Sequence, residues 1–389
     1  MKRQSRSSAQ IRLQSAAGIQ KYLICTFIKQ EDRTMQHHRF TNDYSEGAHP
    51  RILEALMNTN LTQHTGYGMD EHCQKAAELI CRECSHTGSV PDSHPDIRTD
   101  LDVHFLVGGT QTNRIVIDAA LRPYQAVIAV STGHINVHET GAVEASGHKV
   151  IAVPDEDGRL TARAVEKALS AHRDEHMVQP KMVYISNTTE LGTQYTKKEL
   201  EELSHLCRSK GLYLFLDGAR LGSALTSPVN DLTMADLADL TDAFYIGGTK
   251  NGALFGEALV IRNDSIKEDF RYMIKQNGAM LAKGWLLGIQ FETLFADGLF
   301  YEMAAHANEL AQIMRKGFED CGISFLSSSA SNQLFPIVDD SLAEKLMTLY
   351  GANAERKTDE THTAIRFVTS WATPREAAEG FVRELRAMV

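Results

Sequence analysis

The sequence predicts an α/β fold built on a mostly parallel sheet of seven strands, with a smaller α+β region after it. From about residue 100, short apolar runs alternate with helical stretches, which is typical of parallel strands joined by helices. Most of these runs are almost continuously apolar, as expected of strands that are covered on both faces. After about residue 285 the alternation stops, and a long helical stretch leads into short strands.

The predicted strands are the apolar runs themselves. They are Val103–Val107, Ala126–Val130, Lys149–Val153, Met182–Ser186, Tyr213–Leu216, Ala243–Ile246 and Ala258–Ile261. Helices predicted between them include Thr112–Leu121, Thr161–His172 and Lys197–Lys210, and Gly211 is a typical stop signal for the last of these. In such a sheet the connections are right-handed and ligands bind at the carboxyl ends of the strands.

The C-terminal part predicts a second, smaller domain. A helical pattern covers Trp285–Cys321 with a break near Gly298, and Thr373 followed by Pro374 predicts the N-cap and first position of a last helix. Short strands are expected at Ile323–Leu326, Leu334–Val338 and Ala364–Thr369. We therefore expect a large domain at residues 61–285 and a small domain made of 39–60 with 286–389.

Composition narrows the class of protein. The 389 residues contain 40 Lys and Arg against 50 Asp and Glu, a formal charge of −10, which argues against nucleic acid or an anionic membrane as a partner. No uncharged apolar run approaches the roughly 18–20 residues of a membrane span. Six cysteines in a chain of this length favour a reduced, cytoplasmic setting over a disulfide scaffold.

The first 40 residues differ from the rest, with eight basic side chains against two acidic ones. We expect residues 1–38 to be an N-terminal extension outside the fold. Two explanations stay open: the segment resembles an organellar transit peptide, or it is translated from upstream of a start at Met35.

Two candidate functional residues follow predicted strands directly. Lys250 comes after Ala243–Ile246 between glycines, in a spacing that is not a Walker loop because Asn251 stands where a hydroxyl is required. Taken alone, such a lysine is usually a solvated loop residue. Asp217 ends an apolar strand, and a buried carboxylate needs a cationic partner. That partner is either Arg220, three residues later, or a protonated ring nitrogen of a ligand.

Two further motifs lie at strand ends. Gly109 and Thr110 lead from a strand into a helix, where backbone N–H groups and hydroxyls form an anion site. His134 follows Ala126–Val130, and its imidazole is suited either to stacking on a flat ring or to an ordinary loop.

Together the four motifs match the needs of one cofactor, pyridoxal 5'-phosphate (PLP). It requires a lysine for covalent attachment, a carboxylate on the ring nitrogen, an anion site for the phosphate and a flat group over the ring. Their order along the chain resembles the aspartate-aminotransferase fold of PLP enzymes. The motifs Asp217-Gly-Ala-Arg-Leu and Gly248-Thr-Lys are similar to those of the β-eliminating lyase and L-threonine aldolase family, over about residues 40–389.

This resemblance implies roles for the cofactor-binding residues. Lys250 would attach PLP, Asp217 would bind its ring nitrogen, and His134 would stack on the ring. Gly109 and Thr110 would bind the phosphate. A family arginine that helps to bind the phosphate is replaced in this chain near residues 280–283, and Lys283 would compensate for it.

The resemblance also implies how substrate is bound. Arg220 and Arg366 would hold the α-carboxylate of an amino acid, beside a polar segment that contains Asn42 and Asp43. Tyr67 matches an aromatic residue that reaches the active site of a neighbouring subunit. A homodimer or homotetramer is therefore expected.

One departure from the family concerns the substrate hydroxyl. Family aldolases carry a histidine after the strand that corresponds to Met182–Ser186, whereas this chain has Thr189 and Glu190 there. The remaining candidates for the proton acceptor are His134, His138 and Glu190. Glu190 is also suited to capping the turn that follows.

A metal site is not expected. Cys73, Cys81 and Cys84 lie roughly on one helical face, with His72 and His86 nearby, but a second cysteine pair at zinc-finger spacing is missing. We interpret these cysteines as helix packing.

The leading hypothesis is a PLP-dependent carbon–carbon lyase. It would cleave a β-hydroxy-α-amino acid of the L-threonine or L-allo-threonine type to glycine and an aldehyde. One alternative is β-elimination or transamination with the same cofactor. The other is a non-catalytic α/β binding module.

Overall fold

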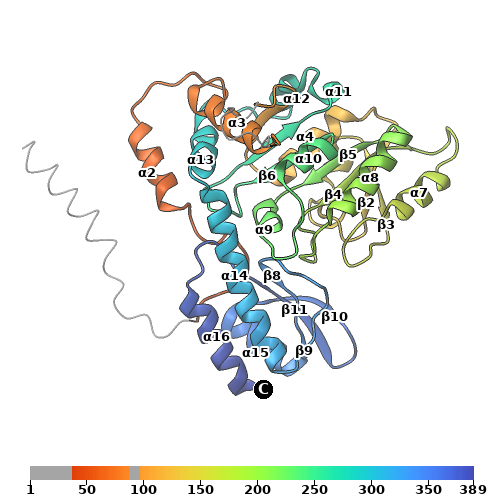
Figure 1. Ribbon diagram of the computed structural model, residues 1–389. Helices are drawn as coiled ribbons and strands as arrows, with labels where there is room; N and C mark the ends of the chain where they lie inside the picture. Colours follow the sequence, from red (N-terminus) through yellow and green to blue (C-terminus); the bar gives the residue numbers. More distant parts are fainter. Residues whose placement is uncertain (1–36, 87–96) are drawn as a thin grey trace, which may run out of the picture. The chain divides into compact units, whose positions relative to one another are not determined.

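A seven-stranded sheet forms the centre of the computed structural model, which describes residues 37–86 and 97–389 (Figure 1). Its strand order is β1-β7-β6-β5-β4-β2-β3. The pairs β6–β5, β5–β4, β4–β2 and β2–β3 are parallel, and β7 is antiparallel to both of its neighbours. The prediction of a mostly parallel seven-stranded α/β sheet is confirmed.

Every strand predicted for this sheet is present, with ends shifted by at most a few residues. The strands are β1 (Asp102–Leu106), β2 (Gln125–Val130), β3 (Lys149–Val153), β4 (Gln179–Ser186), β5 (Tyr213–Asp217), β6 (Ala243–Gly247) and β7 (Glu257–Ile261). Ser186 and Asp217 are paired in register, so the carboxyl ends of β4 and β5 lie side by side.

Helices connect and cover these strands. They are α2 (Pro50–Thr59), α3 (Glu71–Glu83), α4 (Gly109–Ala120), α5 (His134–Val137), α6 (Ala142–Ala145), α7 (Ala162–Ala171), α8 (Lys197–Lys210), α9 (Leu221–Leu225), α10 (Met234–Leu240), α11 (Asp264–Lys267), α12 (Phe270–Gln276) and α13 (Trp285–Ala296). The predicted helix Lys197–Lys210 is confirmed, with Thr196 and Glu199 forming a capping box and Gly211 in the left-handed conformation at its end.

Both faces of the large sheet are buried. On β5, Leu214 and Leu216 pack into one apolar cluster, while Phe215 between them packs into another. Because successive side chains of a strand point to opposite faces, each cluster covers one face of the sheet. This double burial explains why the strands are continuously apolar in sequence.

The C-terminal part forms a four-stranded sheet in which β10 and β8 flank β11, and β9 also pairs with β11. Its elements are α14 (Leu299–Asp320), β8 (Gln333–Leu334), β9 (Ile337–Asp339), α15 (Asp340–Tyr350), β10 (Asn353–Lys357), β11 (His362–Val368) and α16 (Arg375–Met388). Helix α14 contacts α9, α16 and β8 (Figure 1). The domain division at residue 285 stays a prediction.

Several expectations for this region need correction. Leu334–Val338 is interrupted and forms parts of two short strands, and the segment 323–326 contributes only an isolated bridge from Phe325 to Pro336. Strand β10 was not expected, because its sequence is polar and its side chains are mostly exposed. The N-cap of α16 is Pro374 rather than Thr373, whose hydroxyl accepts a hydrogen bond from the Ser370 backbone.

The predicted helix break at Gly298 is confirmed: α13 ends and α14 begins there, with Gly298 at a φ of 74°. Residues Arg39–Val389 form one compact unit, and the expectation for residues 1–38 falls almost wholly outside the described residues. No helix in the described part of the chain is both long and apolar enough to cross a membrane. The five cysteines described are free thiols.

Candidate active site

Lys250 lies in the turn that follows β6, at the carboxyl edge of the large sheet. Burial and the charge of Arg220 lower the pKa of its amine, although three nearby carboxylates act in the opposite direction. A lysine attacks a carbonyl only as the neutral amine, so a lowered pKa suits a nucleophile.

Glu257, which begins β7, is one of those carboxylates. It is buried, and its two oxygens accept hydrogen bonds from the Thr249 hydroxyl at 2.9 Å and the Gly248 backbone at 3.2 Å. Burial raises its pKa, which favours the uncharged acid. It therefore fixes the turn that carries Lys250 more than it neutralises the lysine.

Asp217 ends β5, next to β6 in the sheet, and is buried. Burial alone would raise the pKa of its carboxyl, but the charge of His134 and hydrogen bonds from Tyr184, Tyr245 and the Ala219 backbone hold it below the usual value. The Tyr184 hydroxyl lies 2.6 Å from Oδ2 and the Ala219 nitrogen 3.0 Å from Oδ1. Asp217 does not pair with Arg220, so its negative charge is available to a cationic ligand atom.

A hydrogen-bond chain connects His134 with Asp217. His134 Nδ1 lies 2.7 Å from Glu139 Oε1, which accepts from Asn113 Nδ2 at 2.8 Å. The same Asn113 nitrogen lies 3.0 Å from Asp217 Oδ2. Because Glu139 is fully buried and acts as an acceptor, it holds the proton of His134 on Nδ1 and leaves Nε2 free.

The N-terminus of α4 forms the anion site. This helix begins at Gly109, three residues before the expected start. Its N-cap residue is Gly108, and no side chain of the described residues caps the helix there. The first backbone N–H groups of the helix are thus left for a ligand. Gly109 is required there, because a Cβ atom would lie 2.9 Å from the Tyr245 hydroxyl. Thr110 is exposed beside it.

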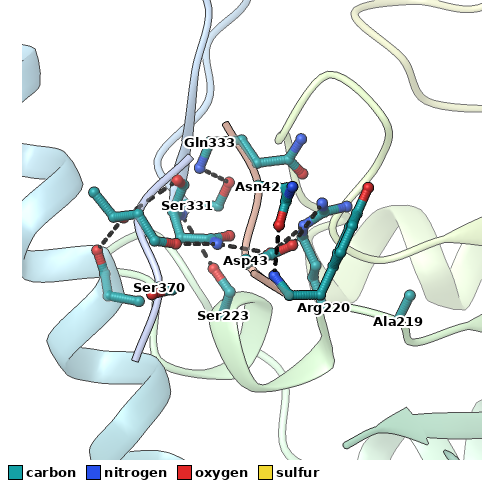
Figure 2. Close-up of polar contacts among 12 residues, drawn as sticks. Asn42, Asp43, Ala219, Arg220, Ser223, Ser331, Gln333 and Ser370 are labelled. Carbon is teal, nitrogen blue, oxygen red and sulfur yellow. Dashed lines mark hydrogen bonds and ion pairs between the residues drawn. The ribbon is translucent and has the colours of Figure 1, made fainter. Parts of the chain in front are cut away.

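Arg220 is held by the segment that precedes α2. Its Nε and Nη2 donate to the two oxygens of Asp43 at 2.7 and 3.1 Å (Figure 2). Asp43 is buried and also accepts a hydrogen bond from Asn332 at 3.0 Å. Arg220 therefore already has a carboxylate partner inside the protein.

Arg366, on β11, is the second arginine of the site. Its Nε is buried and finds no hydrogen-bond partner among residues 37–86 and 97–389, and no ion pair of Arg366 is present in that part of the chain. Burial and the charge of Arg220 lower the pKa of its guanidinium. An unpaired guanidinium fork is suited to binding a carboxylate at two points.

The roles of two substrate-binding candidates from the sequence, Asn42 and Tyr67, stay predictions. The Asn42 side chain accepts hydrogen bonds from Tyr44 and Ser45 in a local turn, so Asp43 rather than Asn42 contacts Arg220. Tyr67 is 48% exposed, and the described residues include no contact from it to the other candidates.

Glu190 binds the loop of His134. Its Oε1 accepts hydrogen bonds from the His134 backbone and the Ser186 hydroxyl, both at 2.8 Å, and burial raises its pKa. Thr189 bonds to Thr193 at 2.7 Å and is also buried. The Glu190 carboxylate thus caps the start of α5, and not the turn that follows residue 190.

Sequence reasoning missed Asn113, Glu139, Tyr184, Tyr245 and Glu257. Asn113 follows the glycines by only four residues, and Glu139 follows His134 by five, so proximity to a motif was the available signal. Tyr184 and Tyr245 lie inside apolar strands, where the sequence gives no sign of a role in a site. Only the sheet order brings their hydroxyls to Asp217.

These residues fit PLP. Lys250 is suited to its aldehyde, Asp217 to the ring nitrogen and the uncapped end of α4 to its phosphate, while the orphaned Nε of Arg366 marks a place for a substrate carboxylate. The fold and this site define a PLP-dependent enzyme of the aspartate-aminotransferase-like class.

Comparisons with known proteins agree. Residues 50–341 match the beta-eliminating lyase family, and the chain belongs to that family. It is therefore a PLP-dependent lyase. A threonine aldolase structure from Leishmania major is similar at 53% identity and a TM-score of 0.85, covering 90% of this chain and 99% of that one.

More distant relatives give the same picture. A low specificity L-threonine aldolase from Pseudomonas sp. (strain NCIMB 10558) is 28% identical over 370 residues, covering 92% of this chain and 99% of that protein. Aspartate aminotransferase from Thermus thermophilus has a TM-score of 0.66 at 15% identity over the full length of both chains, a likeness of fold alone.

Proposed function

We propose that this lyase cleaves the Cα–Cβ bond of a β-hydroxy-α-amino acid of the L-threonine or L-allo-threonine type, releasing glycine and an aldehyde. The observation that carries the proposal is the Arg366 guanidinium, whose Nε has no partner among the described residues and which lies near His134, His138 and Lys250. The charges of Arg366, Lys250 and His134 all act on His138, and the two imidazole rings lie with centroids 5.5 Å apart. An α-carboxylate and a β-hydroxyl are the groups that these side chains can recognise.

Each residue has a role in this proposal. Bound PLP supplies an electron sink that weakens bonds to Cα. Asp217 holds a proton on the ring nitrogen, and His134 covers the ring with its orientation set by Glu139. Arg366 binds the substrate carboxylate, while Arg220 adds positive charge and keeps Asp43 in place. These contacts would fix the orientation of the bound amino acid.

The β-hydroxyl proton is assigned to the imidazole pair rather than to Glu190. Glu190 Oε1 already accepts two hydrogen bonds, and its Oε2 is buried. Burial together with the neighbouring cationic groups lowers the pKa of His138, so this histidine is neutral and able to accept a proton near pH 7. Without the family histidine, we expect activity on L-threonine that is weaker than in a typical family member, and preference for another β-hydroxy amino acid.

The test is product analysis with purified protein and added PLP. L-threonine, L-allo-threonine and bulkier β-hydroxy amino acids are each supplied, and glycine and the aldehyde are measured. Equal amounts of both products support the proposal. If an oxo acid forms without glycine, the reaction is β-elimination or transamination and not aldol cleavage. Protein that takes up no PLP would favour a binding module.

We also propose that the chain forms a homodimer or homotetramer in which Tyr67 contributes to a neighbouring active site. Tyr67 is exposed, has a left-handed φ of 62°, and lies beneath the Lys275 ammonium, 5.0 Å from its ring centroid. Sedimentation gives the assembly size. Activity restored by mixing Tyr67→Ala and Lys250→Ala chains would support a shared site, because one site of a mixed dimer keeps both residues. The cytoplasmic location stays a prediction from composition.

A further inference from the structure

Metal-binding side chains gather at a second place, where the loop before α3 meets α3 and α13. Within the described residues, His64, Glu71 and His72 each offer a ligand atom within 4.8 Å of the others. His64 comes from the loop, and Glu71 and His72 come from the first turn of α3. The ring of Trp285, at the start of α13, lies against His64. Helix α3 packs along α13 (Figure 1).

His64 is the unusual member of this group. Its side chain is 1% exposed, yet neither ring nitrogen has a hydrogen-bond partner in the described part of the chain. Imidazole nitrogens removed from water without a partner are costly, and buried groups of this kind call for an unseen water or ion. A Glu71 carboxylate oxygen lies 3.5 Å from His64 Nδ1, which is too far for a good hydrogen bond.

His72 is oriented as a metal ligand. Its Nδ1 lies 2.6 Å from Glu292 Oε2, and the other oxygen of Glu292 lies 2.8 Å from the Lys75 ammonium. The carboxylate accepts the Nδ1 proton, which leaves Nε2 with a free electron pair. A carboxylate behind the histidine is the usual outer arrangement at protein metal sites, where it fixes the tautomer and the ring plane.

We propose that His64, Glu71 and His72 bind a divalent transition-metal ion, with Zn²⁺ as the reference ion and a fourth position open to water. Two imidazoles and one carboxylate form a ligand set that zinc accepts in proteins. Zinc–ligand bonds of about 2.0–2.2 Å put tetrahedral ligands roughly 3.3 Å apart, so the 3.5 Å separation of His64 and Glu71 already fits. The exposed Glu71 side chain is free to close the remaining distance.

The ion would tie the loop that carries Tyr67 to α3. His64 precedes Tyr67 by three residues, and the loop is otherwise held by the Tyr67 backbone, which donates to Ala282 at 3.1 Å and accepts from Arg271 at 3.1 Å. The proposal is independent of the reaction catalysed, because no residue of the proposed active site is a ligand.

The test is titration of the full-length holoenzyme with Zn²⁺, followed by calorimetry, and with Co²⁺, followed by its visible ligand-field bands. One ion per chain is expected, with a rise in thermal midpoint. His64→Ala and Glu71→Gln should abolish or strongly weaken binding, and Glu292→Gln should weaken it by about 10–100-fold through the loss of orientation. Mg²⁺ should not compete, because it prefers oxygen ligands.

His86→Asn is the matched control, because His86 is an exposed histidine paired with Asp239 at 2.7 Å, outside the group. It should bind Zn²⁺ as the wild type does. Glu71 is 72% exposed, so Glu71→Gln tests the site even where His64→Ala fails to fold. Wild-type protein that binds no ion, or one that binds equally well after Glu71→Gln and Glu292→Gln, overturns the proposal.

Discussion

Arg220 and Asp43 form a two-point ion pair, in which the guanidinium after β5 holds the carboxylate before α2 at 2.7 and 3.1 Å. Both side chains are largely buried. The pair gives Arg220 a carboxylate partner, whereas the other arginine of the site, Arg366, has none among the described residues. The two arginines, equivalent in sequence reasoning, therefore differ in what their removal should do.

Removal of Arg366 should affect ligand binding. Arg366→Ala should weaken binding of the product glycine by about 2–4 kcal/mol, the usual loss for a buried charge-assisted pair. Arg366→Lys should not rescue it, because an ammonium cannot bind a carboxylate at two points. Glycine titration followed by cofactor absorbance measures this. If Arg366→Ala binds glycine with wild-type affinity, Arg220 and not Arg366 binds the carboxylate.

Removal of Arg220 should affect stability. Arg220→Ala leaves the buried Asp43 carboxylate with Asn332 as its remaining hydrogen-bond donor among the described residues, and loss of one partner of a buried pair costs about 3–5 kcal/mol. Urea unfolding of the single and double variants measures this cost. Adding Asp43→Asn to Arg220→Ala should recover part of it, because the unpaired charge is gone. Equal stability of wild type and Arg220→Ala contradicts the buried pair.

Lys250→Ala should fold but lose covalent attachment of PLP. Borohydride reduction followed by peptide mass spectrometry should find the cofactor on Lys250 in the wild type and on no residue in the variant. Turnover should fall by many orders of magnitude, as when a nucleophile is removed from a concerted site. Lys198→Ala, on the exposed face of α8, is the control and should behave as wild type. Cofactor trapped on another lysine refutes the assignment.

Asp217→Asn removes the charge that should keep the ring nitrogen protonated while preserving the shape of the side chain. PLP should still bind, and turnover should fall by about a hundredfold or more, in the range of other electrostatic stabilisers. Steady-state kinetics at saturating PLP measures the effect. Asp239→Asn, at a surface ion pair with Arg98, is the control. Unchanged turnover in Asp217→Asn removes the residue from the mechanism.

The pH profile should report His138. Burial, together with the positive charges of His134, Arg366 and Lys250, lowers its pKa below the ordinary 6.5. A proton acceptor works in its neutral form, so kcat/KM should hold its plateau down to a pH below 6.5 and fall only under that. His138→Phe should lower the plateau and remove this acid limb. If His138→Phe keeps the wild-type profile while His134→Phe loses cleavage but still binds PLP, His134 is the acceptor.

The sequence predicts the large sheet well because its strands are buried on both faces and therefore continuously apolar. The helix break at Gly298 was predictable too, because a glycine at a φ of 74° interrupts an otherwise continuous helical pattern. Prediction failed where a strand is almost wholly exposed. Strand β10 has the sequence Asn-Ala-Glu-Arg-Lys, which carries no apolar alternation, and its pairing with β11 alone defines it.

The site was predictable as far as its motifs reach. Lys250, Asp217 and His134 follow strands in the chain, so their place at the carboxyl edge follows from the sheet. The partners of these residues are set by side-chain contacts between distant segments, as with Asp43 and Arg220, 177 residues apart. Asn42 and Asp43 are neighbours in sequence, and only the packed structure shows that the second faces the arginine.

The bond from Glu190 to the His134 backbone has a consequence for redesign of this enzyme. The family histidine would be restored at position 189, where Thr189 is buried, bonds to Thr193 at 2.7 Å and packs against Gly158. Position 190 is different, because its carboxylate accepts a hydrogen bond from the backbone of His134, the residue proposed to stack on the cofactor ring. Varying both positions together would add a base at position 189 but remove the hydrogen bond that Glu190 makes to the His134 backbone. A redesign should therefore keep residue 190 as part of the scaffold, and a change at residue 189 needs room made beside Gly158.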